Sequence, residues 1–398
     1  MVFVGKGKHN FVIVQHFCPI LTQYPHIFPV VRAVDWFIRS FFCTFTAKMC
    51  NRRRLVFRPM KRYENYSLLA HNTFGMDVRA VLFFEYDTVE ELRAFLLTDD
   101  FIHCDRYLHI GSGSNLLFAG DYKGVVMHSA MRTLEVVSET DDHVLVRVGS
   151  GYVWDDFVAH CVAQGWAGVE NLTAIPGEVG ASAVQNIGAY GVEVRDVIVQ
   201  VEAMALDGSV RTFTNEECQY GYRDSVFKRE LRGQYIVTHV TYRLDKTPTY
   251  RLDYGDLRSR VEACGEPTLQ AVRDAVAAIR DSKLPDPSVL GNAGSFFTNP
   301  VIPRVQYEAL KAQYPTMPSY PVSEALVKVP AGWLIDSAGW KGRSLGRAAV
   351  HDRQALVLVN LGGATGQEVM ALAERVCEEV YNRYGIRITP EVNFISCD

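Results

Sequence analysis

The sequence predicts a mixed α+β protein of two or three domains. Its 398 residues are too many for one small module, at roughly 150 residues per domain. Apolar residues make up 48% and charged residues 22%, which is typical of globular chains and argues against disorder, collagen or coiled coil. Segments with helical apolar spacing alternate with β-rich runs. These observations predict helices packed on sheets around a substantial core.

The first predicted elements lie between residues 79 and 165. Arg79–Tyr86 is rich in β-branched and aromatic residues and predicts a strand. Thr88 and Glu91 form a capping-box pattern that opens a helix through about Leu97. Apolar residues recur with helical spacing at Trp154, Phe157, Val158, Cys161 and Val162, which predicts a second helix. This helix ends near Gly165.

The second half continues the same alternation. Residues 197–244 read as strands with a turn at Asp207-Gly208. A helix from about Leu269 stops before Pro285, and the two prolines of residues 284–287 indicate a domain change. Residues 355–360 predict a buried strand, and a last helix runs from about Gln367 to Gly385.

The charge is uneven along the chain. The formal net charge is −4, so no global field would hold a nucleic acid. Residues 1–59, however, carry nine Lys and Arg against one acidic residue, Asp35, and show no clear period. An uncharged run over residues 10–31 contains Pro19, Pro25 and Pro29, which argues against a membrane span. We expect residues 1–59 to be a disordered extension or the product of a misplaced start codon, with Met60 as the true start.

Cysteine usage indicates a reducing compartment. The nine Cys are scattered without a C-x-x-C pair, so neither a zinc site nor a disulfide framework is predicted. We expect no metal and a cytoplasmic location.

Two loops of small residues carry the strongest functional signal. The first, Gly111–Asn115, follows a strand-like run, and glycines there let successive N–H groups converge on a phosphate. Leu116 stands where a dinucleotide fingerprint needs its third glycine, and no helical pattern follows, so a Rossmann interpretation is weak. The second, residues 175–191, has few bulky side chains. Each loop alone could be a structural turn or crossing, but two together favour a cofactor with a diphosphate.

Six motifs follow one another along the chain: Gly111–Asn115, Pro176–Gly191 with its Gln185–Gly191 core, Gly221–Ser225, Lys283–Pro287, Gly291–Phe297 and Pro390–Val392. In this order they resemble the UDP-N-acetylenolpyruvoylglucosamine reductase family. The resemblance covers about Met60 to the C-terminus and does not extend to residues 1–59.

The resemblance implies a fold like that of vanillyl-alcohol oxidase and p-cresol methylhydroxylase, with two FAD-binding subdomains at residues 60–128 and 129–284 and an α+β substrate domain at residues 285–398. It implies that NADPH reduces UDP-N-acetylglucosamine enolpyruvate to UDP-N-acetylmuramate, a cytoplasmic step of peptidoglycan synthesis. Some relatives of the wider fold attach flavin through a His in the first loop. Asn115 falls near that place, so we expect non-covalent FAD, and we expect a monomer.

The positions that match the family's flavin contacts lie in both loops. They are Gly111, Ser112, Gly113, Ser114, Asn115, Pro176, Gly177, Gly180, Ala181, Ser182, Asn186, Ile187 and Gly188.

The implied chemistry needs an enolate stabiliser and a proton donor. Hydride from the flavin N5 would reach the β-carbon of the enolpyruvyl group, leaving enolate character beside its carboxylate. By resemblance, Arg223 binds that carboxylate together with Glu391, and Ser295 donates the proton. Without the resemblance, a turn-capping serine, a surface arginine and a solvated glutamate would be the ordinary interpretations.

Five further residues match substrate-binding positions of the family. They are Tyr190, Tyr222, Tyr254, Lys283 and Asn299. Tyr254 lies on a loop that resembles the substrate-covering tyrosine loop of the longer subtype, and Lys283 and Asn299 are the candidates for the diphosphate.

Two other classes fit less well. An oxidase of the same fold would lack the Ser295 and Glu391 pair and would often carry an attachment histidine. A non-enzymatic binding protein would not need Ser295, Arg223 and Glu391 together.

Overall fold

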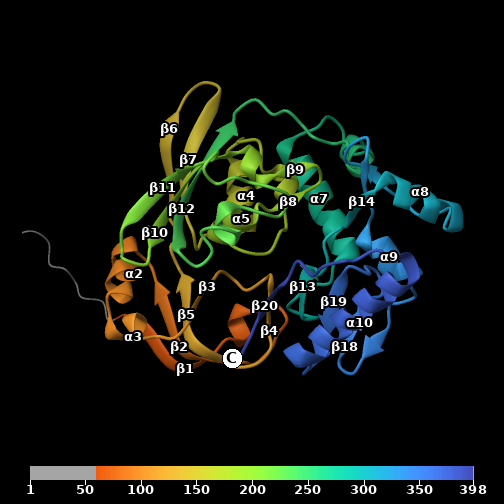
Figure 1. The fold of residues 1–398 in the computed structure, drawn as a ribbon. Helices are drawn as coiled ribbons and strands as arrows, with labels where there is room; N and C mark the ends of the chain where they lie inside the picture. The colour runs from red at the N-terminus through yellow and green to blue at the C-terminus, as the bar shows by residue number, and fades with distance from the viewer. Residues whose placement is uncertain (1–59, 398) are drawn as a thin grey trace, which may run out of the picture. The chain divides into compact units, whose positions relative to one another are not determined.

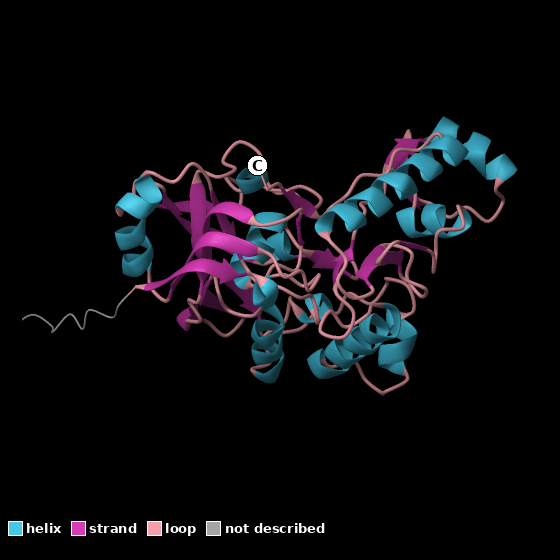
Figure 2. Ribbon diagram, turned by 90° about the horizontal axis from the view of Figure 1, so that it is seen from below, coloured by secondary structure: helices cyan, strands magenta, loops and turns pink. Residues whose placement is uncertain are grey.

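The computed structural model describes residues 60–397, and the expectations about residues 1–59 lie outside these described residues (Figure 1). Helices and strands are mixed throughout this part of the chain (Figure 2), which confirms the α+β class. No helix within it is long and apolar enough to cross a bilayer. The subdomain boundaries stay predictions.

The first sheet has the strand order β1-β2-β5-β3. Its strands are β1 (Lys61–Ser67), β2 (Arg79–Tyr86), β3 (Tyr107–Ile110) and β5 (Tyr122–Ser129). β1 is antiparallel to β2, and the other pairs are parallel. Helix α2 (Val89–Leu96) packs on β2, with the Phe95 and Phe84 rings stacked at 3.9 Å; the short α3 (Asp99–Ile102) follows.

The predicted cap of α2 is confirmed in part. Thr88 Oγ1 accepts a hydrogen bond from the Glu91 N–H at 3.1 Å. The Glu91 carboxylate, however, accepts from the Asp87 N–H at 2.8 Å rather than from the cap residue itself. The cap therefore satisfies one orphan N–H of the helix and one of the preceding turn.

The second sheet is antiparallel, with the order β11-β10-β12-β7-β6. Its strands are β6 (Leu134–Glu139), β7 (His143–Gly149), β10 (Ile198–Ala205), β11 (Val210–Thr214) and β12 (Tyr235–Asp245). The predicted helix α4 (Trp154–Ala163) lies beside it (Figure 1) and buries Trp154 and Phe157 against Tyr242 of β12. This aromatic contact anchors the helix to the sheet.

The second loop is not a loop throughout, which corrects the sequence interpretation. Residues Val179–Gln185 form helix α5, followed by the two-residue strands β8 (Gly188–Ala189) and β9 (Val192–Glu193). The small residues serve close packing, because a Cβ on Gly180 would lie 2.7 Å from Ser150 Cβ. Small side chains thus let a short helix pack closely, which agrees with the structural crossing that the sequence left open as an alternative.

The remaining elements follow β12 along the chain. Helices α6 (Leu257–Glu262) and α7 (Leu269–Lys283) precede the C-terminal sheets. One antiparallel sheet contains β13 (Asn292–Ser295), β19 (Val357–Asn360), β18 (Ala348–Val350) and β17 (Ser344–Leu345), in that order. A smaller one contains β14 (Val301–Pro303), β16 (Leu326–Lys328) and β15 (Tyr320–Pro321). The helices are α8 (Arg304–Gln313), α9 (Ala331–Ser337) and α10 (Gly366–Tyr384).

The last strand returns to the first loop. β20 (Asn393–Ile395) pairs in parallel with β4 (Leu116–Phe118), the strand that follows Gly111–Asn115. The Asn393 N–H donates to Asn115 O at 3.1 Å. This pairing brings residues 390–392 beside the glycine-rich turn (Figure 1) and so positions the site.

Candidate active site

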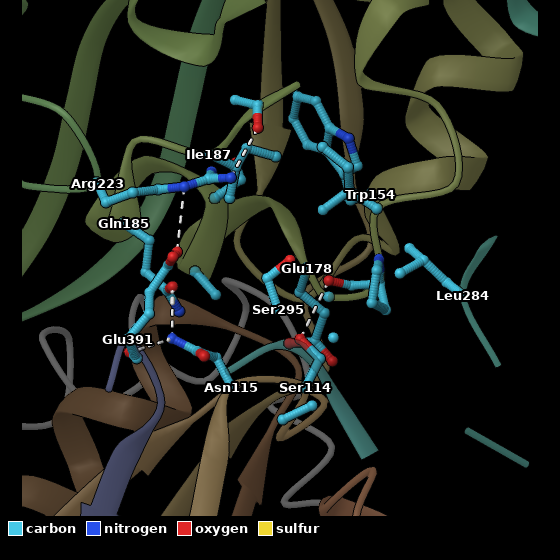
Figure 3. Close-up of a pocket in the computed structure, with 18 of the residues that line it drawn as sticks. Ser114, Asn115, Trp154, Glu178, Gln185, Ile187, Arg223, Leu284, Ser295 and Glu391 are labelled. Atoms are coloured by element: carbon cyan, nitrogen blue, oxygen red, sulfur yellow. Dashed lines mark hydrogen bonds and ion pairs between the residues drawn. The ribbon is translucent and has the colours of Figure 1, made fainter. Parts of the chain in front are cut away.

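A cavity of about 140 Å³ opens between the two loops and the C-terminal segments. Eleven of the predicted site residues line it: Ser114, Asn115, Pro176, Gly177, Ala181, Ser182, Ile187, Gly188, Arg223, Ser295 and Glu391. In the view of Figure 3, Arg223 and Glu391 lie on one side, Trp154 and Leu284 on the other, and Ser295 between them. Residues separated by up to 277 positions in the sequence thus meet at one cavity.

The two loops contact each other directly. Ser114 Oγ donates to Pro176 O at 3.0 Å. Asn115 Nδ2 donates to Gln185 Oε1 at 2.8 Å and to Glu391 O at 3.3 Å (Figure 3). Asn115 therefore links the first loop, helix α5 and the C-terminal segment in one hydrogen-bonded unit.

Asn186 has a different place from the other loop residues. It ends α5 in the left-handed conformation at φ 45° and is fully buried. Its Nδ2 donates to Gly221 O at 2.7 Å and to Glu193 Oε2 at 3.0 Å. The amide thus holds the second loop against the turn that carries Arg223, outside the cavity.

Arg223 and Glu391 form an ion pair. Their Nε and Oε1 atoms lie 3.1 Å apart, with Nε–H making no hydrogen bond, and Arg223 Nη2 donates to Gly188 O at 2.8 Å. Arg223 adopts φ 55°, a conformation that is strained for a side-chain-bearing residue. Lys228 Nζ donates to Arg223 O at 2.7 Å, and burial lowers the pKa of Lys228. Gly188 and Glu391 therefore hold the guanidinium of Arg223, and Lys228 holds its backbone carbonyl.

Ser295 ends β13 with its side chain exposed. Gly294, before it, adopts φ 67°, and the Phe296 carbonyl after it accepts from the Glu391 N–H at 2.8 Å. No hydrogen bond of the Ser295 hydroxyl occurs among residues 60–397. The backbone therefore fixes Ser295 beside Glu391 and leaves its O–H free for a ligand.

Two charged residues that line the cavity were missed by sequence reasoning. Arg280 of α7 donates from Nε to Ala174 O at 3.2 Å, and burial lowers its pKa. It stands four residues after the inward-facing Val276, so an arginine on an apolar helix face was the available signal. Glu178 lies in the second loop, where a lone carboxylate among small residues was the signal.

The other predicted substrate residues lie away from the main cavity. Tyr254 and Asn299 line a second cavity of about 290 Å³, shared with Tyr320, Trp333, Lys341 and Gln354. Tyr190 packs edge-on against Tyr254 at 5.7 Å, and burial raises the pKa of both. Tyr222 is half exposed under the ammonium of Lys328 at 5.2 Å. Lys283 is exposed at the end of α7.

The loops fit a phosphate-bearing cofactor. Ser112 Oγ is buried in the first loop without a hydrogen-bond partner in the described structure, and such an orphan hydroxyl calls for an external acceptor. A Cβ on Gly177 would lie 3.3 Å from Ser114 Oγ, in the junction between the loops. No group of His, Cys, Asp and Glu suited to a metal occurs in residues 60–397.

Two family profiles match the chain. Residues 102–214 match an FAD binding domain, and residues 286–395 match the UDP-N-acetylenolpyruvoylglucosamine reductase C-terminal domain.

Curated relatives cover most of the chain. A UDP-N-acetylenolpyruvoylglucosamine reductase of Bacteroides fragilis is 56% identical over 332 residues, 83% of this chain and 99% of that protein. One of Porphyromonas gingivalis is 46% identical over 334 residues, covering 83% and 98%. One of Chromobacterium violaceum is 49% identical over 328 residues, covering 81% and 96%.

A solved structure has the same fold. The UDP-N-acetylenolpyruvylglucosamine reductase from Thermus caldophilus superposes with a TM-score of 0.60 at 24% identity, covering 85% of this chain and 99% of that one. At this identity the likeness concerns the fold alone.

Proposed function

The chain belongs to the UDP-N-acetylenolpyruvoylglucosamine reductase family, and on that premise we propose that it reduces UDP-N-acetylglucosamine enolpyruvate to UDP-N-acetylmuramate for peptidoglycan synthesis in the cytoplasm. NADPH is the reductant, and FAD binds without covalent attachment. We propose that the protein acts as a monomer.

One observation carries the assignment of residues. Arg223 and Glu391 form their 3.1 Å ion pair on the wall of a cavity that Ser295 and both glycine-rich segments also line. Reduction of an enolpyruvyl ether calls for such groups beside a cofactor site: a planar cation, a carboxylate and a free hydroxyl.

The cofactor is held by the first loop and α5, with Ser112, Ser114 and Asn115 as hydrogen-bonding residues and Gly177 giving close access. When bound, FAD supplies the hydride that adds to the β-carbon of the enolpyruvyl group. The chain's own residues manage the charge that results. Arg223, steadied by Glu391, binds the substrate carboxylate and stabilises negative charge that spreads onto it from the α-carbon.

Ser295 then donates its hydroxyl proton to the α-carbon. A serine hydroxyl is a weak acid in water, so this step needs a strongly basic carbanion and close positioning. The Ser295 hydroxyl suits this step, because strand β13 fixes its position and it makes no hydrogen bond within the described structure.

The UDP part of the substrate is proposed to lie toward the second cavity. Tyr254 and Asn299 line that cavity, and Lys283 offers a cation near the end of α7. Asn299 Oδ1 already accepts from the Ala331 N–H at 2.9 Å, which leaves its amide N–H₂ group as the donor toward a diphosphate.

Anaerobic spectroscopy of the two half-reactions tests the proposal. Purified full-length protein should be yellow, should bleach with NADPH, and should regain its colour when UDP-N-acetylglucosamine enolpyruvate is added without oxygen. A colourless protein that takes up no flavin would contradict the proposal. Bleaching without recovery on addition of this substrate would contradict the substrate assignment alone.

A further inference from the structure

A row of alternating charges crosses the first sheet and ends at the cavity. Lys61, Glu85 and His128 occupy matched positions on β1, β2 and β5. Lys61 Nζ lies 3.2 Å from Glu85 Oε1, and Glu85 Oε2 lies 3.1 Å from His128 Nδ1. His128 Nε2 then lies 3.0 Å from Oε1 of Glu178, which lines the cavity.

Both nitrogens of His128 face carboxylate oxygens. A neutral imidazole carries one N–H, so one of these contacts would then join two lone pairs. Only the doubly protonated ring can donate to two ionised carboxylates at once. His128 is 7% exposed and Glu178 is 6% exposed, and a buried pair of this kind is retained at a desolvation cost.

The pKa directions agree with this geometry. Burial alone would lower the pKa of His128, but the hydrogen bonds and charges of Glu178 and Glu85 outweigh it and raise that pKa above the usual 6.5. Burial lowers the pKa of His71, whose ring lies 5.1 Å from that of His128, to about 4. Burial lowers that of His109 to about 3, so both neighbouring rings are neutral near pH 7.

One oxygen of Glu178 accepts no hydrogen bond from residues 60–397. Oε1 is taken by His128, whereas no described residue donates a hydrogen bond to Oε2. Oε2 lies 3.1 Å from where a Cβ on Gly111 would stand, at the start of the first loop. A carboxylate oxygen without a protein donor can accept a hydrogen bond from a ligand. The family's predicted flavin contacts did not include this residue.

We propose that Glu178 is a binding residue for the flavin nucleotide, with Oε2 accepting a hydrogen bond from a hydroxyl or N–H group of FAD, and that His128 and Glu85 are its positioning residues. This inference rests on the proposed function, because it needs FAD in the cavity. It gives the row of charged residues a function in cofactor binding.

The test measures FAD affinity rather than turnover. Full-length holoprotein is diluted in series, and released FAD is followed by its fluorescence. Glu178→Gln should raise the Kd for FAD on the order of tenfold, because a charge-assisted hydrogen bond is lost. Glu178→Asp, which keeps the charge on a shorter side chain, should give a smaller rise and covers the case that Glu178→Gln does not fold.

A matched control separates binding from folding. His239 of β12 is also a buried histidine, with Glu202 and Arg147 beside it, but it does not line the cavity. His239→Gln should lower the melting temperature without changing the Kd for FAD. An unchanged Kd in both Glu178 variants would overturn the inference. A wild-type protein that holds no FAD would overturn the proposed function instead.

The pH profile tests the positioning role of His128. The titratable groups that surround the row come from several elements: Lys61, His71 of η3 (Leu69–His71), Glu85, Tyr86, Asp87, His109 and Glu178. The Kd for FAD should rise as pH increases through the raised pKa of His128, because loss of its proton breaks one contact. In His128→Gln this rise should vanish, and a profile identical to wild type would remove His128 from the role.

Competition identifies the part of FAD that is contacted. FMN and ADP are each used to displace FAD from wild type and from Glu178→Gln. A loss of affinity for FMN alone places the contact on the riboflavin half, and a loss for ADP alone places it on the adenosine half. Equal affinities of both probes for the two proteins would contradict the proposal.

Discussion

The two sides of the cavity differ in how far their polar groups are already engaged by protein. On the proposed cofactor side, formed by the first loop and α5, Ser114, Asn115 and Glu178 each have protein hydrogen-bond partners. The Ser112 hydroxyl and the second carboxylate oxygen of Glu178 are the exceptions in the described structure. On the substrate side, Ser295 is exposed with its hydroxyl free in the described structure, and Tyr254 is 54% exposed. Arg223 is intermediate, anchored to Gly188 and Glu391.

The difference follows from how long each ligand stays. A resident cofactor gains affinity from a site that is ordered before it binds, because less conformational freedom is lost. A substrate that enters and leaves in each cycle must find groups that are not already satisfied. The comparison predicts that cofactor-side changes alter flavin retention and stability, whereas substrate-side changes alter turnover.

The strongest test is Ser295→Ala. It should lower turnover on the order of 10²–10⁴-fold, because the proposed proton donor is removed, while flavin reduction by NADPH stays within about twofold in stopped flow. Ser209→Ala, in an exposed turn with its hydroxyl on Asp207, serves as control and should match wild type. Equal losses in both half-reactions would break the comparison, since Ser295 would then act on the cofactor side.

Arg223→Lys should be nearly as damaging. An ammonium cannot keep the contacts to Gly188 O and Glu391 while forming a two-pronged contact with a carboxylate. We expect kcat/KM to fall on the order of 10²–10³-fold in steady-state assays. Arg229→Lys changes an exposed arginine that pairs with Asp224 in the same turn and should cost less than about threefold; wild-type kinetics for Arg223→Lys would remove it from the site.

Gly113 and Gly294 allow the tightness of packing on the two sides of the cavity to be compared. Gly113 and Gly294 have similar φ values of 71° and 67°. A Cβ on Gly113 would lie 1.9 Å from His71 O, whereas nothing lies within 4 Å of one on Gly294. Gly113→Ala should therefore destabilise by about 2–4 kcal/mol, and Gly294→Ala by about 1–2 kcal/mol for the left-handed conformation alone. Thermal unfolding measures both, and equal costs would show that the cofactor side is not the tighter one.

The smallest effect is expected at the second cavity. Tyr254→Phe removes one hydroxyl from a half-exposed ring, so KM for the UDP substrate should rise by about threefold to tenfold with kcat nearly constant. Tyr63→Phe, on the exposed strand β1, is the control. A fall in kcat with unchanged KM would place Tyr254 at the reacting centre instead.

Sequence signals were reliable where structure depends on neighbours in the chain. The helix predicted from about Gln367 to Gly385 is α10, Gly366–Tyr384, with Gly385 in the left-handed conformation. The helix predicted to stop before Pro285 ends at Lys283. Capping and periodicity are local effects, so they are visible without the fold.

The second loop shows where local reasoning failed. Gly180 and the alanines of residues 181–183 were taken as backbone access to a ligand, but residues 179–185 form α5, and Gly180 packs on Ser150. Small residues permit close approach of any partner, and the sequence does not state whether that partner is a ligand or a strand.

The sequence by itself determined the α+β class, the helix ends and the order of motifs that identified the family. The family resemblance placed Arg223 and Glu391 together, but only the tertiary structure shows how they meet, through the pairing of β20 with β4, and that His128 meets Glu178. The physical reason is that periodicity and caps report interactions within a few residues, whereas these contacts join segments 168 and 50 residues apart, which only the packing of the sheets brings together.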